Sequence, residues 1–387
     1  MFYENIYDFP SRSFFFAIPY LILAMVSFWA LKGSANYNVK KKGNYIFLIL
    51  LYLFFFGLRW HVLSDSLAYE EEYNTIKPIF NWKYIDEHSW WWDKGFVIFT
   101  MFTKLVSNDF RFFVFVNTLI DITFFSVCIK RYSSNFLVTI LAFLAFQGIL
   151  TEINLFRNIK AILLFLISVK YIENRKWYYF FALNLLGYTL HSSALLFLPM
   201  YWLLRIKIRF KYVAIIIGIF TVIYLFQLNV IENLILQYMP SDGVISNKLT
   251  FYLEDSENTI LSVGTFERIL TLGVSIWVYY KTNNPSLKFT IFFNSFLVFY
   301  IAYSIFGFNP VFRDRIPNLF IFSYWFLYPY LFNYAKSRKI YLKYGFYALF
   351  FVKIYTSTNI CSAYYENILF DNLSTRHERE YLLYKVD

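Results

Sequence analysis

The chain has 387 residues, of which 59% are hydrophobic, 24% aromatic and 16% charged. A soluble domain is closer to half apolar and a quarter charged, so these values exclude a water-soluble enzyme, a disordered chain and a fibrous repeat. The formal net charge of +11 does not indicate a nucleic-acid partner, because Lys and Arg stand between apolar runs, as membrane orientation requires.

Apolar runs that approach the length of a bilayer crossing occur along the whole chain. A helix needs ~20 residues to cross ~30 Å of hydrocarbon. The runs cover residues 13–31, 44–59, 112–129, 136–152, 158–172, 212–230, 263–280, 287–306, 317–335 and 340–357. No repeat or Gly/Ser linker divides them. We therefore expect residues 1–387 to form a single transmembrane domain, an all-α polytopic integral membrane protein of about 11–13 transmembrane helices.

Short connections rich in Lys and Arg predict the orientation. They contain Lys32 with Lys40–Lys42, Lys130 with Arg131, Lys170 with Arg175 and Lys176, Arg205–Lys211, Lys281 with Lys288, and Lys336–Lys343. Such connections are expected on the cytoplasmic side. The outer side then receives the loops 60–111 and 231–262, residues 153–158 and 307–316, a turn at His191 and both termini.

Residues 95–107 are apolar but too few to cross the membrane alone. We expect them to form a re-entrant or interfacial helix within the outer loop 60–111, a structure that is tolerated where it lines a protein cavity. Tryptophans at headgroup level would support it: Trp82, Trp90, Trp91 and Trp92. In the alternative, this segment crosses and the first two helices invert.

Residues 177–204 have basic residues at both ends. A hairpin with both ends inside places His191 at its outer tip. Each arm would be about 20 Å long at 1.5 Å per residue, so the tip would lie at the floor of an outward-facing cavity. A single long helix, with His191 in mid-membrane, is the alternative. Gly187, Ser192, Ser193 and Pro199 weaken a continuous helix and favour the hairpin.

Polar residues at the outer helix ends are the candidates for function, because such groups at membrane depth face an interior or a wet cavity. They are Arg59, His61, Asp65, Glu152, Arg157, Lys160, His191, Arg268, Arg313 and Arg315. Arginine holds phosphate through two parallel, always-charged contacts, so several arginines facing one cavity would suit a diphosphate headgroup. In the alternative, each arginine extends alone to a lipid phosphate.

The segment after Arg59 and the residue His191 each have two interpretations. Tyr69 and Tyr73 share one helical face beside the acidic run Glu70–Glu72, which suits either a carbohydrate-binding rim or a solvated interfacial helix. His191 is either a reactive group or a hydrogen-bonded structural histidine. No other His, Cys or carboxylate stands at metal-ligand spacing from it, and we expect no metal site. Neither a P-loop nor a GxSxG motif occurs.

Four short motifs follow one another in a familiar order. They are Arg59–Trp60 with Asp65 and Tyr69, then Asp93-Lys94-Gly95-Phe96, then Arg157–Asn158, then His191 with Ser193, Ala194 and Pro199. A late arginine, Arg313 or Arg315, precedes an aromatic helix. In this order the chain resembles the EpsG-like branch of the O-antigen and capsular polysaccharide polymerases (Wzy). Leu63 stands where that family often has glycine.

The resemblance implies a membrane glycosyltransferase with a GT-C-like helical bundle, in the bacterial inner membrane, with its active site facing the periplasm or the outside. Its substrate would be an undecaprenyl-diphosphate-linked oligosaccharide repeat unit. A flippase and a chain-length regulator would be its partners, and no cofactor is expected. His191 or Asp65 would be the catalytic base. The substrate-binding residues would be Arg59, Tyr69, Arg157, Asn158, Arg268, Arg313 and Arg315.

Two other classes of function stay open. A flippase or another transporter of lipid-linked oligosaccharide would also hold an anionic headgroup in an arginine-lined cavity. Such transporters more often show repeats and interrupted helices in matched halves, and this sequence does not. A membrane acyltransferase that modifies the polysaccharide could use His191 as its base.

Overall fold

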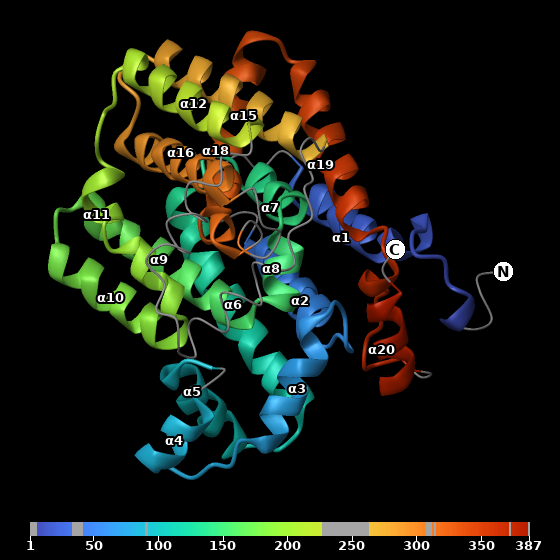
Figure 1. The fold of residues 1–387 in the computed structure, drawn as a ribbon. Coiled ribbons are helices and arrows are strands. Elements are labelled where there is room, and N and C mark those ends of the chain that lie inside the picture. The colour runs from blue at the N-terminus through green and yellow to red at the C-terminus, as the bar shows by residue number, and fades with distance from the viewer. Residues whose placement is uncertain are drawn as a thin grey trace. The chain divides into compact units, whose positions relative to one another are not determined.

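The computed structural model describes residues 6–32, 42–89, 92–226, 263–306, 312, 315–370 and 373–385. These residues form helices and short 3-10 helices, with isolated bridges but no strand among them. The chain divides into two compact units, each described below by itself. Unit 1 contains residues 1–198 and 335–387, and unit 2 contains residues 199–334. Figure 1 shows the helices of both units.

The long helices of unit 1 run between two ends, at which their connections gather. These helices are α1 (Phe14–Leu31), α2 (Lys42–Gly57), α6 (Phe110–Tyr132), α9 (Phe156–Glu173), α10 (Trp177–Leu190) and α19 (Leu342–Thr358). At one end, Arg131 contacts Glu173 at 3.4 Å, and Asn44 donates a hydrogen bond to the carbonyl of Ala30 at 2.7 Å. We call it the basic end, because Lys42, Lys130 and Lys176 lie there. The other is the loop end, which carries residues 58–109.

The run 136–152 is not one straight helix, which corrects the sequence-based expectation. It forms α7 (Phe136–Ala145) and α8 (Gly148–Asn154), which are bent by 63° relative to each other. Gln147 has a left-handed backbone with φ 58°, and a Cβ at Gly148 would collide with the carbonyl oxygen of Phe143. Glycine at 148 therefore permits the sharp bend.

The loop between α2 and α6 is itself folded. It contains α3 (Asp65–Thr75), α4 (Trp82–His88) and α5 (Lys94–Lys104), which lie together beyond the start of α6 (Figure 1). An aromatic core that includes Tyr73, Phe96 and Phe113 joins α3 and α5 to α6. α5 has 11 residues, about 16 Å of helix, which is too short to cross a bilayer.

The tryptophans expected at headgroup level differ in how exposed their side chains are. Trp82 is 70% exposed, whereas Trp92 is only 6% exposed and packs against Tyr69 and Phe96. The position of both tryptophans at headgroup level stays a prediction. Trp90 and Trp91 lie outside the described residues.

The last part of the chain covers the loop end of α2. The backbone N–H of Trp60 donates to Glu366 and that of Ile368 donates to Leu58, at 2.9 and 2.8 Å. Leu63, with φ 62°, has the left-handed backbone that favours glycine, and its N–H donates to Ser362 at 2.9 Å. Farther along, helix α20 (Arg376–Tyr384) contacts both 3-10 helix η5 (Cys361–Ala363) and η1 (Ile6–Asp8). Both termini therefore lie at the loop end, and the expected outward side of that end stays a prediction.

In unit 1, α10 ends at Leu190, and His191 is extended with φ −157° and ψ 118°. The 3-10 helix η3 (Ser192–Phe197) follows and packs against α9 and α10. This confirms that the helix breaks at His191 and excludes the continuous alternative.

Unit 2 consists of α11 (Met200–Leu203), α12 (Phe210–Leu225), α15 (Val263–Lys281), α16 (Leu287–Phe306), η4 (Pro317–Phe320) and most of α18 (Phe322–Arg338). α16 lies at its centre and packs against α12, α15 and η4. The expected loop 231–262 lies outside the described residues.

The class of all-α polytopic membrane protein is confirmed. Among the described residues, three helices are long and apolar enough to cross a membrane, namely α1, α6 and α16, and the bent pair α7–α8 makes a fourth if it is one broken span. The helices α2 and α12 have 16 residues each, about 24 Å. The expected 11–13 spans and the GT-C architecture stay predictions.

Candidate functional site

Three side chains from distant parts of unit 1 meet at the loop end. Asp93 precedes α5, Arg157 lies in the first turn of α9, and His191 directly follows α10. The Asp93 Oδ2 atom is 3.4 Å from His191 Nδ1 and 3.4 Å from one terminal nitrogen of Arg157. The other carboxylate oxygen accepts a hydrogen bond from the backbone N–H of Ser192 at 3.1 Å. One carboxylate therefore links an imidazole, a guanidinium and the start of η3.

The local sequence explains why Asp93 reaches His191. Asp93 is the N-cap residue of α5, but its side chain does not cap that helix. Gly95 lets α5 approach the end of α10, because a Cβ at this position would lie 2.7 Å from the carbonyl oxygen of Thr189. Gly187 differs, because a Cβ there would make only ordinary van der Waals contacts, 3.5 Å from Ala194 Cβ and 3.7 Å from Ala161 Cα. The glycine in the motif Asp93-Lys94-Gly95-Phe96 thus has a steric role.

This group is partly open to its surroundings. The side chains of Asp93 and His191 are 19% exposed, and that of Arg157 is 23% exposed. Burial raises the pKa of Asp93, but the hydrogen bond and charge of His191 and the charge of Arg157 outweigh burial, so the pKa lies below its ordinary value. The carboxylate is therefore ionised at neutral pH and can hold the imidazole in one orientation.

Tyr69 connects this group to α3. The Arg157 Nε–H donates to the Tyr69 hydroxyl at 3.4 Å, and the Tyr69 ring packs against Trp92 and Phe156 at centroid distances of 5.4 and 4.8 Å. Asp65 lies one turn before Tyr69 on the same helix, so both occupy one face of α3. The structure thus brings five residues into one neighbourhood, and four of them were singled out from the sequence.

Asp65 itself is held at the start of α3. The Ser64 hydroxyl donates a hydrogen bond to the Asp65 carboxylate at 3.0 Å. The backbone N–H of Asp65 donates to the side-chain oxygen of Asn154 at 2.7 Å. Asp65 is half-buried. Its carboxylate keeps an oxygen for other contacts, so it remains a candidate base beside His191.

Arg59 has a different environment. It is 4% exposed and donates to the carbonyl oxygens of Phe56 and, at 3.1 Å, Ile153. Its guanidinium also lies 5.2 Å from the ring centre of Phe156. These contacts tie the end of α2 to α8 and α9.

The other predicted substrate-binding residues are spread over the chain. Asn158 is buried beside Arg157 in α9. Arg268 lies 3.9 Å from the ring centre of Tyr303, and Arg315 is exposed; both belong to unit 2. Arg313 lies outside the described residues.

Sequence reasoning did not select two features of unit 1 as sites. Asp93 was quoted only as part of a motif. Asp121 in α6 forms an ion pair of 2.9 Å with Lys160 in α9, and the side chains are 1% and 4% exposed. Glu152, which like Lys160 was among the candidates named from the sequence, is also buried, at 4%. A charged residue within the apolar run 112–129 was the available signal for Asp121.

His61 was a candidate from the sequence, and the structure shows that it contacts the carboxylate of Glu70. Its Nε2 lies 3.3 Å from Glu70 Oε2, and its ring stacks on Phe110. Arg376 of α20 contacts the same oxygen of Glu70, at 3.8 Å. The pKa of Glu70 is lowered mainly by the hydrogen bond with His61. This contact joins α3 to the last helix.

Among the described residues, no three His, Cys, Asp or Glu side chains are grouped so that they could hold a metal ion.

These features define a helical membrane protein with a polar, arginine-containing site where its helices end. The sequence matches the EpsG family over residues 44–370, and the chain belongs to that family. The match includes Asp93, Arg157 and His191. No curated protein and no solved structure matches the chain significantly.

Proposed function

We propose that this protein polymerises a bacterial surface or capsular polysaccharide by joining oligosaccharide repeat units that are carried on undecaprenyl diphosphate. Membership of the EpsG family supports this class of activity. The observation that carries the proposal is the contact of Asp93 with both His191 and Arg157, because it places a base and an anion-binding cation side by side. The protein would act in the bacterial inner membrane, with this site facing outward.

The reaction needs two kinds of group. A base removes the proton from the acceptor hydroxyl as its oxygen bonds to the anomeric carbon of the growing chain. The bond from that carbon to the lipid diphosphate breaks at the same time, and the negative charge that develops on the diphosphate needs stabilisation. His191 supplies the base through Nε2, since Nδ1 faces Asp93. Arg157 stabilises the leaving diphosphate.

Arg157, rather than Arg59, is assigned to the diphosphate because of its surroundings. The Arg157 side chain is 23% exposed, whereas Arg59 is 4% exposed and donates to backbone carbonyls. A guanidinium holds phosphate through a planar pair of donors, which requires an accessible edge. Asn158, Arg268, Arg313 and Arg315 stay candidates for further contacts with the long substrate.

The sugar units need a surface as well as reacting groups. Trp60 is partly exposed and lies near the start of α3, whereas Tyr69 and Trp92 are buried. Aromatic faces combine apolar area with polar edges, and we assign this side of α3 to the oligosaccharide. Asp65 on the same helix is the alternative base.

The experiment that tests this function uses the full-length protein in vesicles. The probe is a purified undecaprenyl-diphosphate-linked repeat unit with a labelled sugar. A ladder of products that differ by one repeat unit supports a polymerase. Translocation of the unit across the vesicle membrane without a ladder would instead identify a flippase, and transfer of an acyl group would identify an acyltransferase.

A further inference from the structure

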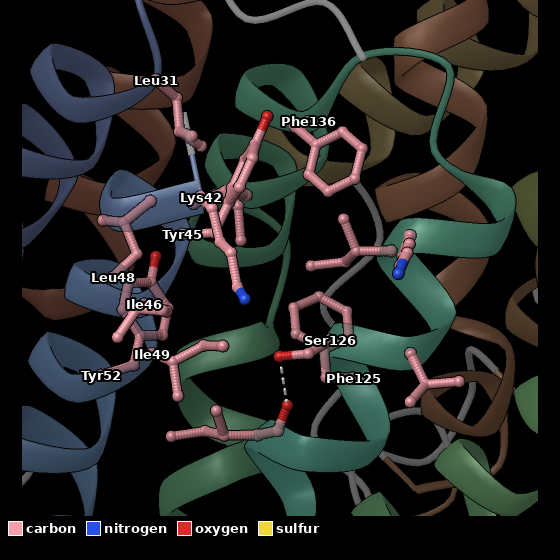
Figure 2. A pocket seen from close by; sticks show the side chains of 15 residues that line it. Leu31, Lys42, Tyr45, Ile46, Leu48, Ile49, Tyr52, Phe125, Ser126 and Phe136 are labelled. Carbon is pink, nitrogen blue, oxygen red and sulfur yellow. Dashed lines mark hydrogen bonds between the residues drawn. The ribbon is translucent and has the colours of Figure 1, made fainter. Parts of the chain in front are cut away.

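The basic end of unit 1 contains an apolar groove far from the candidate site. The start of α2, the end of α6 and the start of α7 enclose a cavity of about 280 Å³. Figure 2 shows its walls, which include Ile46 and Ile49 from α2, Phe125 from α6 and Phe136 from α7. An apolar space of this size loses dispersion contacts unless another apolar group fills it.

Two of the hydroxyl groups that line the groove already have hydrogen-bond partners. The Ser126 hydroxyl donates to the carbonyl of Ile122 at 2.7 Å, as the dashed line in Figure 2 shows. The Tyr52 hydroxyl lies 3.4 Å from that of Ser27. The walls therefore offer little to a polar ligand and suit a hydrocarbon chain.

Two lysines that line the groove give it a positive charge. Lys42, at the start of α2, and Lys130, near the end of α6, both line it, and both are exposed. Figure 2 shows the Lys42 side chain extending into the space between α2 and α6. No acidic side chain is among the described residues that line the groove. A ligand with a hydrocarbon chain and a negatively charged headgroup complements both features.

The groove lies at the opposite end of its helices from the site of Asp93 and His191. α6 has 23 residues, about 34 Å, and runs from Phe110 at the loop end to Tyr132 at the basic end. That length matches the thickness of the hydrocarbon core. A lipid in the groove would therefore belong to the other leaflet from a lipid-linked substrate at the candidate site.

We propose that this groove binds one anionic phospholipid, with an acyl chain between α2, α6 and α7 and with its phosphate at Lys42 and Lys130. Basic residues at a membrane surface attract anionic headgroups, and the apolar walls fix where the chain lies. The lipid would join the first turns of α2 to the last turns of α6. This proposal does not depend on the reaction that the protein catalyses.

The test titrates the delipidated full-length protein with phosphatidylglycerol or phosphatidylcholine of the same acyl chains and counts bound lipids by native mass spectrometry. The wild type should bind one phosphatidylglycerol more tightly than phosphatidylcholine. In the double variant Lys42→Gln/Lys130→Gln that affinity should fall roughly tenfold to thirtyfold, to the value for phosphatidylcholine. Equal binding of the two lipids by the wild type would overturn the proposal.

Two further variants separate this site from general charge effects. Lys176→Gln removes an exposed charge at the same end, outside the groove, and should leave the affinity unchanged. Ile49→Trp should fill the groove and abolish the tight site while both lysines remain. The proposal fails if Lys176→Gln weakens binding as much as the double variant, or if Ile49→Trp binds phosphatidylglycerol as the wild type does.

Discussion

His191 Nδ1 lies 3.4 Å from Asp93 Oδ2, although 98 residues separate them in the chain. The same carboxylate oxygen contacts Arg157 and the other accepts from the N–H of Ser192, so Asp93 positions two groups that the proposed reaction uses. If Asp93 acts only by positioning His191 and Arg157, replacing it should change the polymerisation rate only through those two residues, and variants can measure this.

Replacing Asp93 with Asn keeps the size of the side chain and removes its charge. We expect Asp93→Asn to slow polymerisation about tenfold or more, because the imidazole and guanidinium lose their shared anion. The double variant Asp93→Asn/His191→Ala should be no slower than His191→Ala alone, since both changes disable one unit. Initial rates of ladder formation measure both effects. Asp86→Asn, an exposed carboxylate on α4, is the control, and additive losses would argue that Asp93 and His191 act separately.

His191→Ala should slow polymerisation about 10²–10⁴-fold, so that single lipid-linked units accumulate. The reason is that no other group in the contact takes the acceptor proton. Lipid-linked products from cells with matched protein levels provide the measurement. His88→Ala, which changes a histidine stacked on Tyr84 in α4, should leave the ladder intact. A normal ladder in His191→Ala would transfer the role of base to Asp65.

Replacing Arg157 with lysine and replacing it with alanine should reduce the polymerisation rate to different extents. Each charge-assisted hydrogen bond contributes ~1.5–3 kcal/mol, so Arg157→Ala should lose roughly ten- to a hundredfold in rate. Arg157→Lys keeps the charge without the paired donors and should be partly active. The same exchanges at Arg111, in an exposed ion pair with Asp109, should be nearly silent. If the Arg157 variants are silent too, the residue does not contact the diphosphate.

Gly95→Ala tests the packing that brings Asp93 to His191. The new methyl group would overlap the Thr189 backbone, so α5 must move away from α10. Overpacking of this kind costs ~1–3 kcal/mol, and we expect a loss of polymerisation that exceeds any loss of protein level. Gly345→Ala in α19 is the matched control, because a Cβ there has no neighbour within 4 Å. Full activity of Gly95→Ala would show that the close approach is not needed.

The orientation can be tested with single cysteines at exposed lysines. Lys83→Cys, in α4 at the loop end, should react in intact cells with a membrane-impermeant thiol reagent. Lys176→Cys, at the basic end, should react only after the membrane is opened. The native residues Cys128 and Cys361 are buried and should contribute little background. The reverse pattern would place the Asp93–His191 site on the cytoplasmic side.

Composition and apolar run length predicted the protein class and most helices of unit 1, because hydrocarbon thickness restricts a spanning segment to few solutions. The break at His191 was also predictable, since Gly187, Ser192 and Pro199 oppose a helix there. The break at Gln147 was not, because the run 136–152 is mostly apolar and the bend depends on a left-handed residue beside a glycine.

The sequence identified Tyr69, Arg157 and His191, but it did not identify what holds them. A motif gives the order of residues along the chain, whereas the contact between Asp93 and His191 depends on how α5 packs against α10. In the same way, a position just after an apolar helix does not tell which way a side chain points. Arg59 points inward to backbone carbonyls, and Trp92 packs on Tyr69.

The contacts between residues 58–63 and residues 362–368 have a consequence for biogenesis. The N–H groups of Trp60 and Leu63 are satisfied by carbonyls about three hundred positions later in the chain. These N–H groups therefore lack their final partners during synthesis and must be solvated or shielded by other molecules. This lasts until the ribosome has made all of the intervening helices and the insertion machinery has placed them. The loop end is the last part of unit 1 to be completed, and a nascent chain stalled before residue 362 would hold its helices with that end still open.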